Sequence, residues 1–164
     1  MATRHRIEIA RELFKFSCAH MTVFPDGTKE RLHGHNYFVG VVVELTRIGF
    51  ADMVPFAPLK TAVTEICQEL REHLLLPAHN PLFEVIADDA VELEFRLCGR
   101  RYVVPRDEAI ILPVDNVTVE ALAEHIGTVL LTRQEGLFAR DWVAGLEVMV
   151  TESPGQGARA VFTC

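Results

Sequence analysis

The chain has 164 residues, of which 49% are hydrophobic and 24% charged, a composition that suits one soluble domain with a substantial core and excludes a disordered chain. Sixteen Lys and Arg residues stand against 23 Asp and Glu, and the net charge of −7 argues against general binding to nucleic acid or anionic membranes. No stretch approaches the ~18 apolar residues of a membrane span, and the N-terminus lacks the apolar segment of a secretory signal.

The four cysteines are scattered through the chain without CxxC spacing. Reduced thiols are the simplest interpretation of this pattern. We therefore expect a cytoplasmic protein with a single domain over residues 1–164.

The first predicted element is a long strand over residues 4–20. Its apolar residues change alternation phase near 10–13, which indicates either a bulge or a strand buried on both faces. A Pro-Asp-Gly turn signal follows within 21–32. Residues 36–46 are rich in valine and aromatic side chains and predict a second strand.

Residues 56–75 carry apolar side chains at helical spacing and predict the first helix. Residues 91–105 alternate apolar and charged side chains around Gly99, which is typical of a hairpin. This hairpin lies within a segment, 83–115, to which the sequence assigns no role.

A second helix begins at a capping residue, either Asn116 or Thr118. Two final strands are predicted over 145–152 and 158–163. Consecutive strands joined by short turns pair antiparallel, so the order of elements predicts an α+β domain with helices on one face of an antiparallel sheet.

His33 and His35 are candidate metal ligands at the start of the second strand. Side chains two residues apart point to the same face, and His20, at the end of the preceding strand, lies opposite them if the two strands form a hairpin. Three neutral imidazoles suit zinc and leave a fourth position open for water or substrate. Cys18 shares the face of His20, either as a fourth ligand or as a small buried residue. The plain alternative is a set of surface histidines on a strand.

The segments "FKFSCAH", "RLHGHNYFVGVVVE", "NVTVEALAEHI" and "VMVTESPGQGARAVF" together resemble the 6-pyruvoyl-tetrahydropterin synthase family, which includes the bacterial 6-carboxytetrahydropterin synthases. The resemblance runs in the family order over nearly the whole chain. It implies the tunnelling fold, a four-stranded antiparallel sheet with two helices, assembled as trimers and then hexamers with active sites between subunits. It also implies a catalytic zinc, held by His20, His33 and His35.

The same resemblance implies a substrate, 7,8-dihydroneopterin triphosphate, and roles for four further residues. Glu152 would accept hydrogen bonds from the pterin ring, and Thr118 would lie near the substrate. His73 would be a general acid or base, with Glu72 where the family usually has Asp. The alternatives are an exposed charge for Glu152 and a histidine that favours the helix dipole for His73. Neighbouring helical residues do not face each other, so a direct contact of Glu72 with His73 requires the helix to end or distort there.

Glu30 stands near where family members usually have a reactive cysteine a few residues before the HGH motif, and the loop 21–32 contains no cysteine. Position 29, where the bacterial carboxy type tends to have it, is Lys. The pattern Glu-x-x-His-Gly-His resembles a subtype whose product is 6-hydroxymethyl-7,8-dihydropterin, a folate precursor. The alternative is a solvated loop charge. A glutamate base near neutral pH would need its pKa raised by burial.

Three functions therefore remain open. The leading hypothesis is a zinc-dependent lyase acting on dihydroneopterin triphosphate, with the triphosphate near Lys15, Lys29 or Arg31. A second is a 6-carboxy- or 6-pyruvoyl-tetrahydropterin synthase, the former serving queuosine synthesis. The third is a protein that binds pterin, or a zinc-stabilised assembly module, without catalysis.

Overall fold

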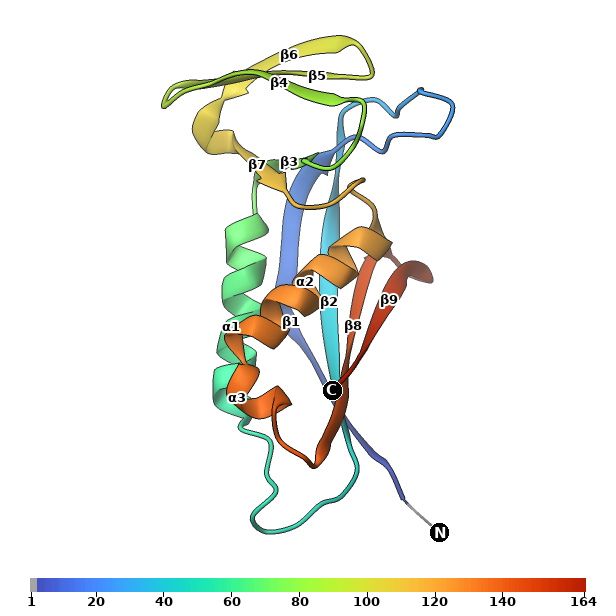
Figure 1. The fold of residues 1–164 in the computed structure, drawn as a ribbon, viewed down its shortest axis with the longest axis vertical. Helices are drawn as coiled ribbons and strands as arrows, with labels where there is room; N and C mark the ends of the chain where they lie inside the picture. The colour runs from blue at the N-terminus through green and yellow to red at the C-terminus, as the bar shows by residue number, and fades with distance from the viewer. Residues whose placement is uncertain (1–2) are drawn as a thin grey trace.

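The main sheet of the computed structural model, which describes residues 3–164, is built on two long strands (Figure 1). β1 (His5–His20) and β2 (His33–Leu45) pair antiparallel, and their register shifts between Ala10 and Lys15, which confirms the bulge. Two further strands continue the sheet in antiparallel pairing: β8 (Val143–Ser153) and β9 (Gln156–Thr163). These four strands and the helices beside them confirm the predicted α+β class.

Two short strands extend this sheet beyond β1, in the order β7-β3-β1-β2-β8-β9. β3 (His73–Pro77) pairs parallel with β1, and β7 (Ala109–Leu112) pairs parallel with β3, so the complete sheet is mixed. Neither strand follows from the sequence pattern, because "HLLLP" continues the apolar spacing of the preceding helix and "AIIL" is very short.

The first helix is shorter than its apolar spacing predicts. α1 covers Phe56–Leu70, so the prediction of a helix over 56–75 is wrong at its C-terminal end. Glu72 has a left-handed backbone, with φ of 61°, through which a helix cannot continue. Its N–H donates to the Ser17 carbonyl at 2.6 Å. This contact turns the chain into the edge of the sheet, where β3 begins at His73.

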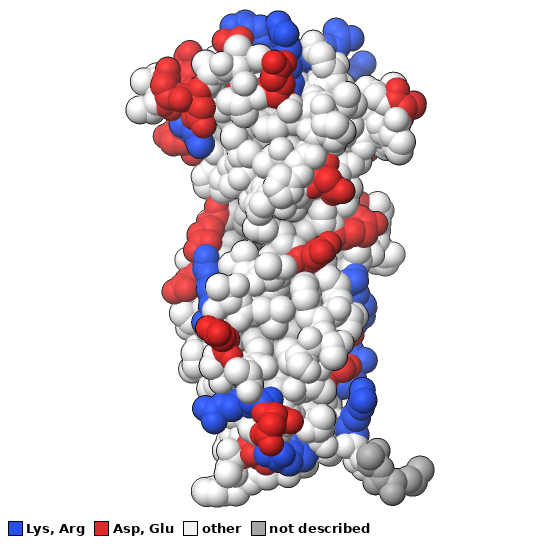
Figure 2. Space-filling view, viewed as in Figure 1, with Lys and Arg blue, Asp and Glu red and all other residues white. Residues whose placement is uncertain are grey.

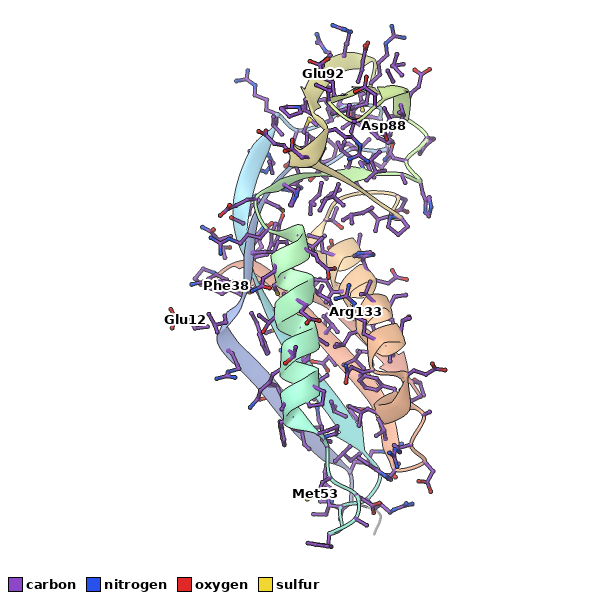
Figure 3. The ribbon with its side chains drawn as sticks, turned by 90° about the vertical axis from the view of Figure 1, so that its left-hand side faces the viewer. Glu12, Phe38, Met53, Asp88, Glu92 and Arg133 are labelled. Carbon is purple, nitrogen blue, oxygen red and sulfur yellow. The ribbon has the colours of Figure 1, made fainter. Side chains whose placement is uncertain are left out.

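The helices lie on one face of the main sheet (Figures 1 and 3). α2 (Val119–Arg133) starts after Thr118, whose hydroxyl accepts from the N–H of Ala121 at 3.4 Å, so Thr118 is the cap. A short turn, α3 (Glu135–Phe138), follows. On the other face Phe38 is 46% exposed and points away from the helices (Figure 3).

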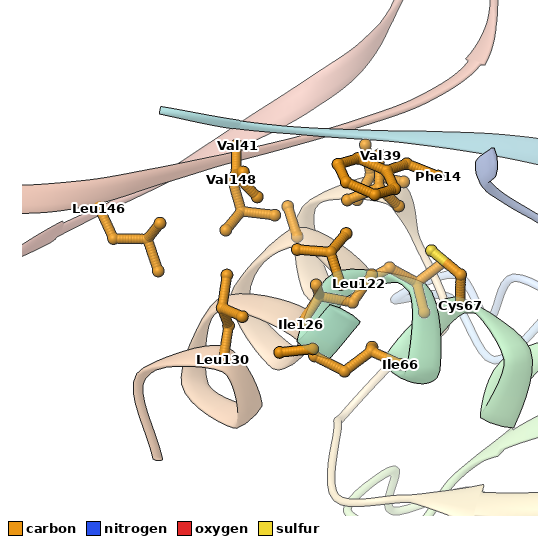
Figure 4. Packing of buried hydrophobic residues seen from close by; sticks show 14 of the residues in the cluster. Phe14, Val39, Val41, Ile66, Cys67, Leu122, Ile126, Leu130, Leu146 and Val148 are labelled. Carbon is orange, nitrogen blue, oxygen red and sulfur yellow. The ribbon is translucent and has the colours of Figure 1, made fainter. Parts of the chain in front are cut away.

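The main hydrophobic core lies between the sheet and the helices. Figure 4 shows this core, with ten of its residues labelled: Phe14, Val39, Val41, Ile66, Cys67, Leu122, Ile126, Leu130, Leu146 and Val148.

A separate antiparallel sheet caps one end of the molecule (Figure 1). The predicted hairpin is present as β5 (Glu92–Leu97) and β6 (Arg100–Pro105), joined at Cys98 and Gly99, which both have positive φ. β4 (Phe83–Asp88) adds a third strand that the sequence pattern does not predict. A 3₁₀ turn, η1 (Arg106–Glu108), leads back to β7. We call β4, β5 and β6 the inserted sheet.

The inserted sheet has its own hydrophobic core, distinct from the main one. Eight buried residues form this second core: Met21, Val23, Leu74, Leu76, Leu93, Phe95, Leu97 and Ala109. They come from the loop after β1, from β3 and β7, and from the inserted sheet. The second core therefore fixes the inserted sheet to the end of the main sheet.

The surface agrees with the acidic composition. Acidic and basic side chains are interspersed on the described residues of the face in Figure 2, without a continuous basic surface. Within residues 3–164, every helix is too short or too polar to cross a bilayer.

Candidate metal centre and active site

Three histidines meet where β1 ends and β2 begins. The antiparallel register places His20 directly opposite His33, and His35 follows on the same face of β2. One ligand nitrogen of each ring lies within 4.8 Å of the other two. The ring centroids of His20 and His33 are 4.6 Å apart, and those of His33 and His35 are 4.9 Å apart. The structure thus brings together the three residues that the sequence predicts as ligands.

Backbone carbonyls orient two of these rings. His20 Nδ1 lies 2.8 Å from the Val117 carbonyl, and His33 Nδ1 lies 2.7 Å from the Arg31 carbonyl. A carbonyl only accepts hydrogen bonds, so each Nδ1 carries the proton and each Nε2 keeps its lone pair. Metal-binding histidines are typically held in this way. Burial lowers the pKa of His20, which favours the neutral imidazole that a metal requires.

The donor set therefore fits a divalent metal such as zinc. Three neutral nitrogens with an open fourth position are typical of a catalytic rather than a structural zinc site. Among the described residues, Cys18 lies outside this cluster of three. Burial raises the pKa of its thiol to about 12, so the side chain is a neutral thiol near pH 7. The interpretation of Cys18 as a small buried residue is the one that agrees with the structure.

Two glutamates lie on opposite sides of the cluster. Glu30 Oε2 is 3.8 Å from His33 Nε2, and Glu152 Oε2 is 3.9 Å from His35 Nε2. The Glu30 side chain is 40% exposed. A hydrogen bond from the side chain of Thr22, helped by the nearby His33, lowers the pKa of Glu30 and outweighs the opposing effect of burial. In the single chain, the raised pKa expected of a glutamate base is therefore absent.

Glu152 is the less exposed of the two, at 16%, and the Gln156 amide donates to its Oε1. A hollow of about 820 Å³ opens beside it, lined among others by Lys15, His35 and Asn36. A carboxylate facing such a hollow can accept two parallel N–H donors from a planar ligand.

His73 and Glu72 do not form the pair suggested by their adjacency. Glu72 turns away and contacts Arg71, with 2.9 Å between Oε1 and Nη2. His73 instead lines a hollow of about 480 Å³, together with Cys18 and His35. Its Nδ1 is buried without a hydrogen-bond partner within the described chain. A buried, unpaired ring nitrogen is costly, which indicates that a ligand or another group completes its hydrogen bonding.

The remaining predicted residues divide between the site and its surroundings. Thr118 caps α2, one residue from the Val117 carbonyl that holds His20. Lys15 lines the hollow beside Glu152. Lys29 points elsewhere, with its Nζ 5.2 Å from the centre of the Tyr102 ring.

The sequence does not predict that the carbonyls of Val117 and Arg31 orient the histidines, because every residue has a backbone carbonyl whatever its side chain. Sequence reasoning also missed the hydroxyl of Tyr37, which lies 3.2 Å from His20 Nε2 and belongs to a side chain with no exposed surface. Its place two residues after His35, on the same face of β2, is the signal that would have found it.

Comparisons with known proteins cover almost the whole chain. Residues 8–161 match the family model described as 6-pyruvoyl tetrahydropterin synthase. A Methanocaldococcus jannaschii protein described as "Putative 6-carboxy-5,6,7,8-tetrahydropterin synthase" is 34% identical over 148 residues, or 88% of this chain and 87% of that protein.

The likeness extends to solved structures. A crystal structure of 6-pyruvoyl tetrahydropterin synthase from Plasmodium vivax has a TM-score of 0.89 at 25% identity, over 99% of both chains. A second structure of the Plasmodium vivax enzyme, described as a catalytic residue mutant in which glutamate is replaced by alanine, has a TM-score of 0.87 with the same identity and coverage. These matches confirm the predicted tunnelling fold.

Proposed function

The chain belongs to the 6-pyruvoyl tetrahydropterin synthase family, and from this premise we propose that it is a zinc-dependent lyase acting on 7,8-dihydroneopterin triphosphate. The observation that carries the proposal is the convergence of His20, His33 and His35, with Glu30 3.8 Å from His33. Two of the rings present Nε2 because their Nδ1 atoms face carbonyls. Zinc at this position would act as a Lewis acid on hydroxyl groups of the substrate side chain.

We propose 6-hydroxymethyl-7,8-dihydropterin as the product. Glu30 takes the proton of the 2′ hydroxyl, the C2′–O bond becomes a carbonyl, and the C1′–C2′ bond breaks. The electron pair of the broken C1′–C2′ bond passes to C1′ and into the pterin ring. A proton is then returned to C1′, which forms the hydroxymethyl group. The other fragment departs as an aldehyde that carries the triphosphate. Support comes from the absence of cysteine in residues 21–32 and from the Plasmodium vivax relative whose catalytic residue is a glutamate.

Other residues would bind and orient the substrate. Glu152 would accept hydrogen bonds from the pterin N–H groups, and Lys15, which lines the same hollow, would contact the triphosphate. The Nδ1 of His73 lacks a hydrogen-bond partner within the described chain, and the ring, which lines a hollow, is our candidate for returning the proton to C1′. We further propose that the chain forms one domain and that its sites are completed between subunits of a hexamer.

A second candidate product is 6-carboxytetrahydropterin, because the Methanocaldococcus jannaschii relative is described as a putative synthase of that compound. Incubation of the zinc-loaded protein with dihydroneopterin triphosphate, followed by mass spectrometry, separates the candidates. We expect the hydroxymethyl product. Formation of carboxy- or pyruvoylpterin alone would contradict our assignment, and tight pterin binding without turnover would favour a binding protein.

A further inference from the structure

The second core packs the inserted sheet against two parts of the chain that carry residues of the proposed site. Met21 and Val23 belong to the loop that carries Glu30, and Leu74 and Leu76 belong to β3, which begins at His73. The inserted sheet supplies Leu93, Phe95 and Leu97, none of which has exposed surface, and β7 supplies Ala109. The inserted sheet therefore packs against the loop that carries Glu30 and against β3, which carries His73. These are the two residues that we propose for proton transfer.

One contact connects the inserted sheet to Glu30 almost directly. The Nζ of Lys29 lies 5.2 Å from the centre of the Tyr102 ring and donates to the Glu30 carbonyl at 3.0 Å. The same Nζ lies 3.3 Å from the sulfur of Met21. Tyr102 is itself held by stacking on Phe95, with ring centroids 5.1 Å apart and planes 12° apart. An ammonium over an aromatic face is stabilised electrostatically, more strongly where water is excluded.

The loop is fixed on its other side by backbone hydrogen bonds. The N–H of Glu30 donates to the Thr22 carbonyl at 2.9 Å, and the side chain of Asn116 bonds both the N–H and the carbonyl of Val23. These bonds hold the base of the loop to the start of α2. The inserted sheet also reaches the loop at Thr28, whose carbonyl accepts from the Cys98 thiol at 3.9 Å. It reaches the backbone of Glu30 through Lys29, whose Nζ lies over the Tyr102 ring and donates to the Glu30 carbonyl.

We propose that the inserted sheet is a positioning element for Glu30, in which Tyr102 holds the ammonium of Lys29 and Lys29 fixes the Glu30 backbone beside His33. This role rests on the proposed function of Glu30 as a base. Lys29 and Tyr102 are positioning residues, because neither has a contact to the histidine cluster. A displacement of about 1 Å at a reacting group can lower the rate about 100-fold, so a contact that fixes the position of Glu30 can affect kcat strongly.

The test compares Lys29→Met, which keeps the aliphatic stem, with Lys29→Arg, which keeps the cation. Lys29→Met should lower kcat by about 10- to 100-fold while KM changes less than about twofold and zinc content stays the same. Lys29→Arg should recover most of the loss. In a Glu30→Ala background, Lys29→Met should cause no further loss, because its effect passes through Glu30. An equal loss in both backgrounds would overturn the proposal.

Two further comparisons separate positioning from a general effect on folding. Tyr102→Phe keeps the aromatic face and should behave as wild type, whereas Tyr102→Leu should resemble Lys29→Met. Lys60, whose Nζ lies 5.3 Å from the centre of the Phe56 ring on α1, offers a matched contact away from the site. Lys60→Met should leave kcat unchanged. A similar loss of kcat in Lys60→Met would contradict a specific role for Lys29.

Amide hydrogen exchange tests the link without relying on turnover. Lys29→Met should speed exchange in residues 22–32 at least several-fold, while α1 and α2 keep wild-type protection. If wild-type protein shows no turnover, the proposed function fails, and exchange alone decides whether Lys29 holds the loop. Unchanged exchange in 22–32, or faster exchange throughout the chain, would overturn the inference.

Discussion

At the residue scale, the chemistry of the site depends on which ring nitrogen of each histidine is free. The carbonyls of Val117 and Arg31 hold Nδ1 of His20 and His33, so the Nε2 atoms point toward their neighbours. Ligands oriented in advance in this way lose little entropy on binding a metal, and such supporting contacts typically contribute 10- to 100-fold in affinity. The two carbonyls thus give His20 and His33 the orientation that a metal centre requires.

Removal of one ligand tests this directly. His33→Ala should lower zinc affinity at least about 100-fold, and zinc, which should raise the melting temperature of the wild type, should not raise that of the variant. Metal analysis after dialysis and thermal unfolding with and without zinc are the measurements. His79→Ala, an exposed histidine outside the cluster, should keep both zinc and its stabilisation. Unfolding of the His33 variant in the absence of zinc, under conditions where the metal-free wild type is folded, would speak for a purely structural site.

The two glutamates beside the cluster should differ in their kinetic effects. Glu30→Gln keeps the shape but cannot take a proton, so kcat should fall about 100- to 10,000-fold with little change in KM. Glu152→Gln loses a charged acceptor for the pterin, and KM should rise about 10- to 100-fold. Steady-state kinetics of both variants gives the comparison. An intact kcat in Glu30→Gln would show that Glu30 is not the base.

At the element scale, the position of His73 follows from where α1 ends. The apolar spacing of 56–75 is equally compatible with a longer helix. Two non-helical residues separate α1 from β3: Arg71, whose backbone is extended with ψ of 136°, and Glu72, whose backbone is left-handed. The same turn directs the Glu72 carboxylate to Arg71 and leaves Nδ1 of His73 unpaired. The backbone conformation of Arg71 and Glu72 thus decides which side chains lie beside His73.

This turn makes a prediction about stability. A left-handed conformation costs a non-glycine residue roughly 1–2 kcal/mol, and glycine adopts it freely. Glu72→Gly should therefore raise the free energy of unfolding by roughly 0.5–1 kcal/mol after the entropic cost of glycine is subtracted. Glu72→Ala keeps the strain and should bring no gain. Urea titrations of the two variants provide the test, and a stabilisation by alanine equal to that by glycine would show that backbone strain is not the cause.

At the scale of the whole molecule, the parts that could be predicted are those with a regular pattern. Strand alternation placed His20, His33 and His35 on one face, and helical spacing found α1 and α2. The short strands β3 and β7 escaped prediction because strands of four or five residues carry too few side chains to show a period. β4 is as long as β5, but its sequence FEVIAD breaks the alternation of apolar and charged side chains, and its pairing is irregular between Val85 and Ala87. The contact of Lys29 with Tyr102 joins residues far apart in sequence, and only the packing of the inserted sheet reveals it.

The main sheet is tied across three strands by one buried carboxylate. Glu147 of β8 is only 7% exposed and contacts Arg6 of β1 at 2.5 Å, with Arg159 of β9 on its other oxygen. Burial alone would raise the pKa of Glu147, but the two guanidinium groups outweigh it and hold the pKa below its ordinary value. The unfolded chain therefore binds a proton at Glu147 at a higher pH than the folded chain does.

The sign of the pH dependence follows from this difference. The stabilisation by Glu147 is complete above the ordinary glutamate pKa of about 4.5 and is lost as pH falls through the lower pKa of the folded state. Wild-type stability should thus decrease more steeply below about pH 4.5 than that of Glu147→Gln, which cannot titrate but is less stable near pH 7. Glu94→Gln, which removes a partly exposed carboxylate paired with Arg101, is the control and should change stability little. Denaturant titrations between about pH 3 and 7 measure the slopes. Equal slopes for wild type and Glu147→Gln would show that the two arginines do not depress the pKa of Glu147 in the folded protein.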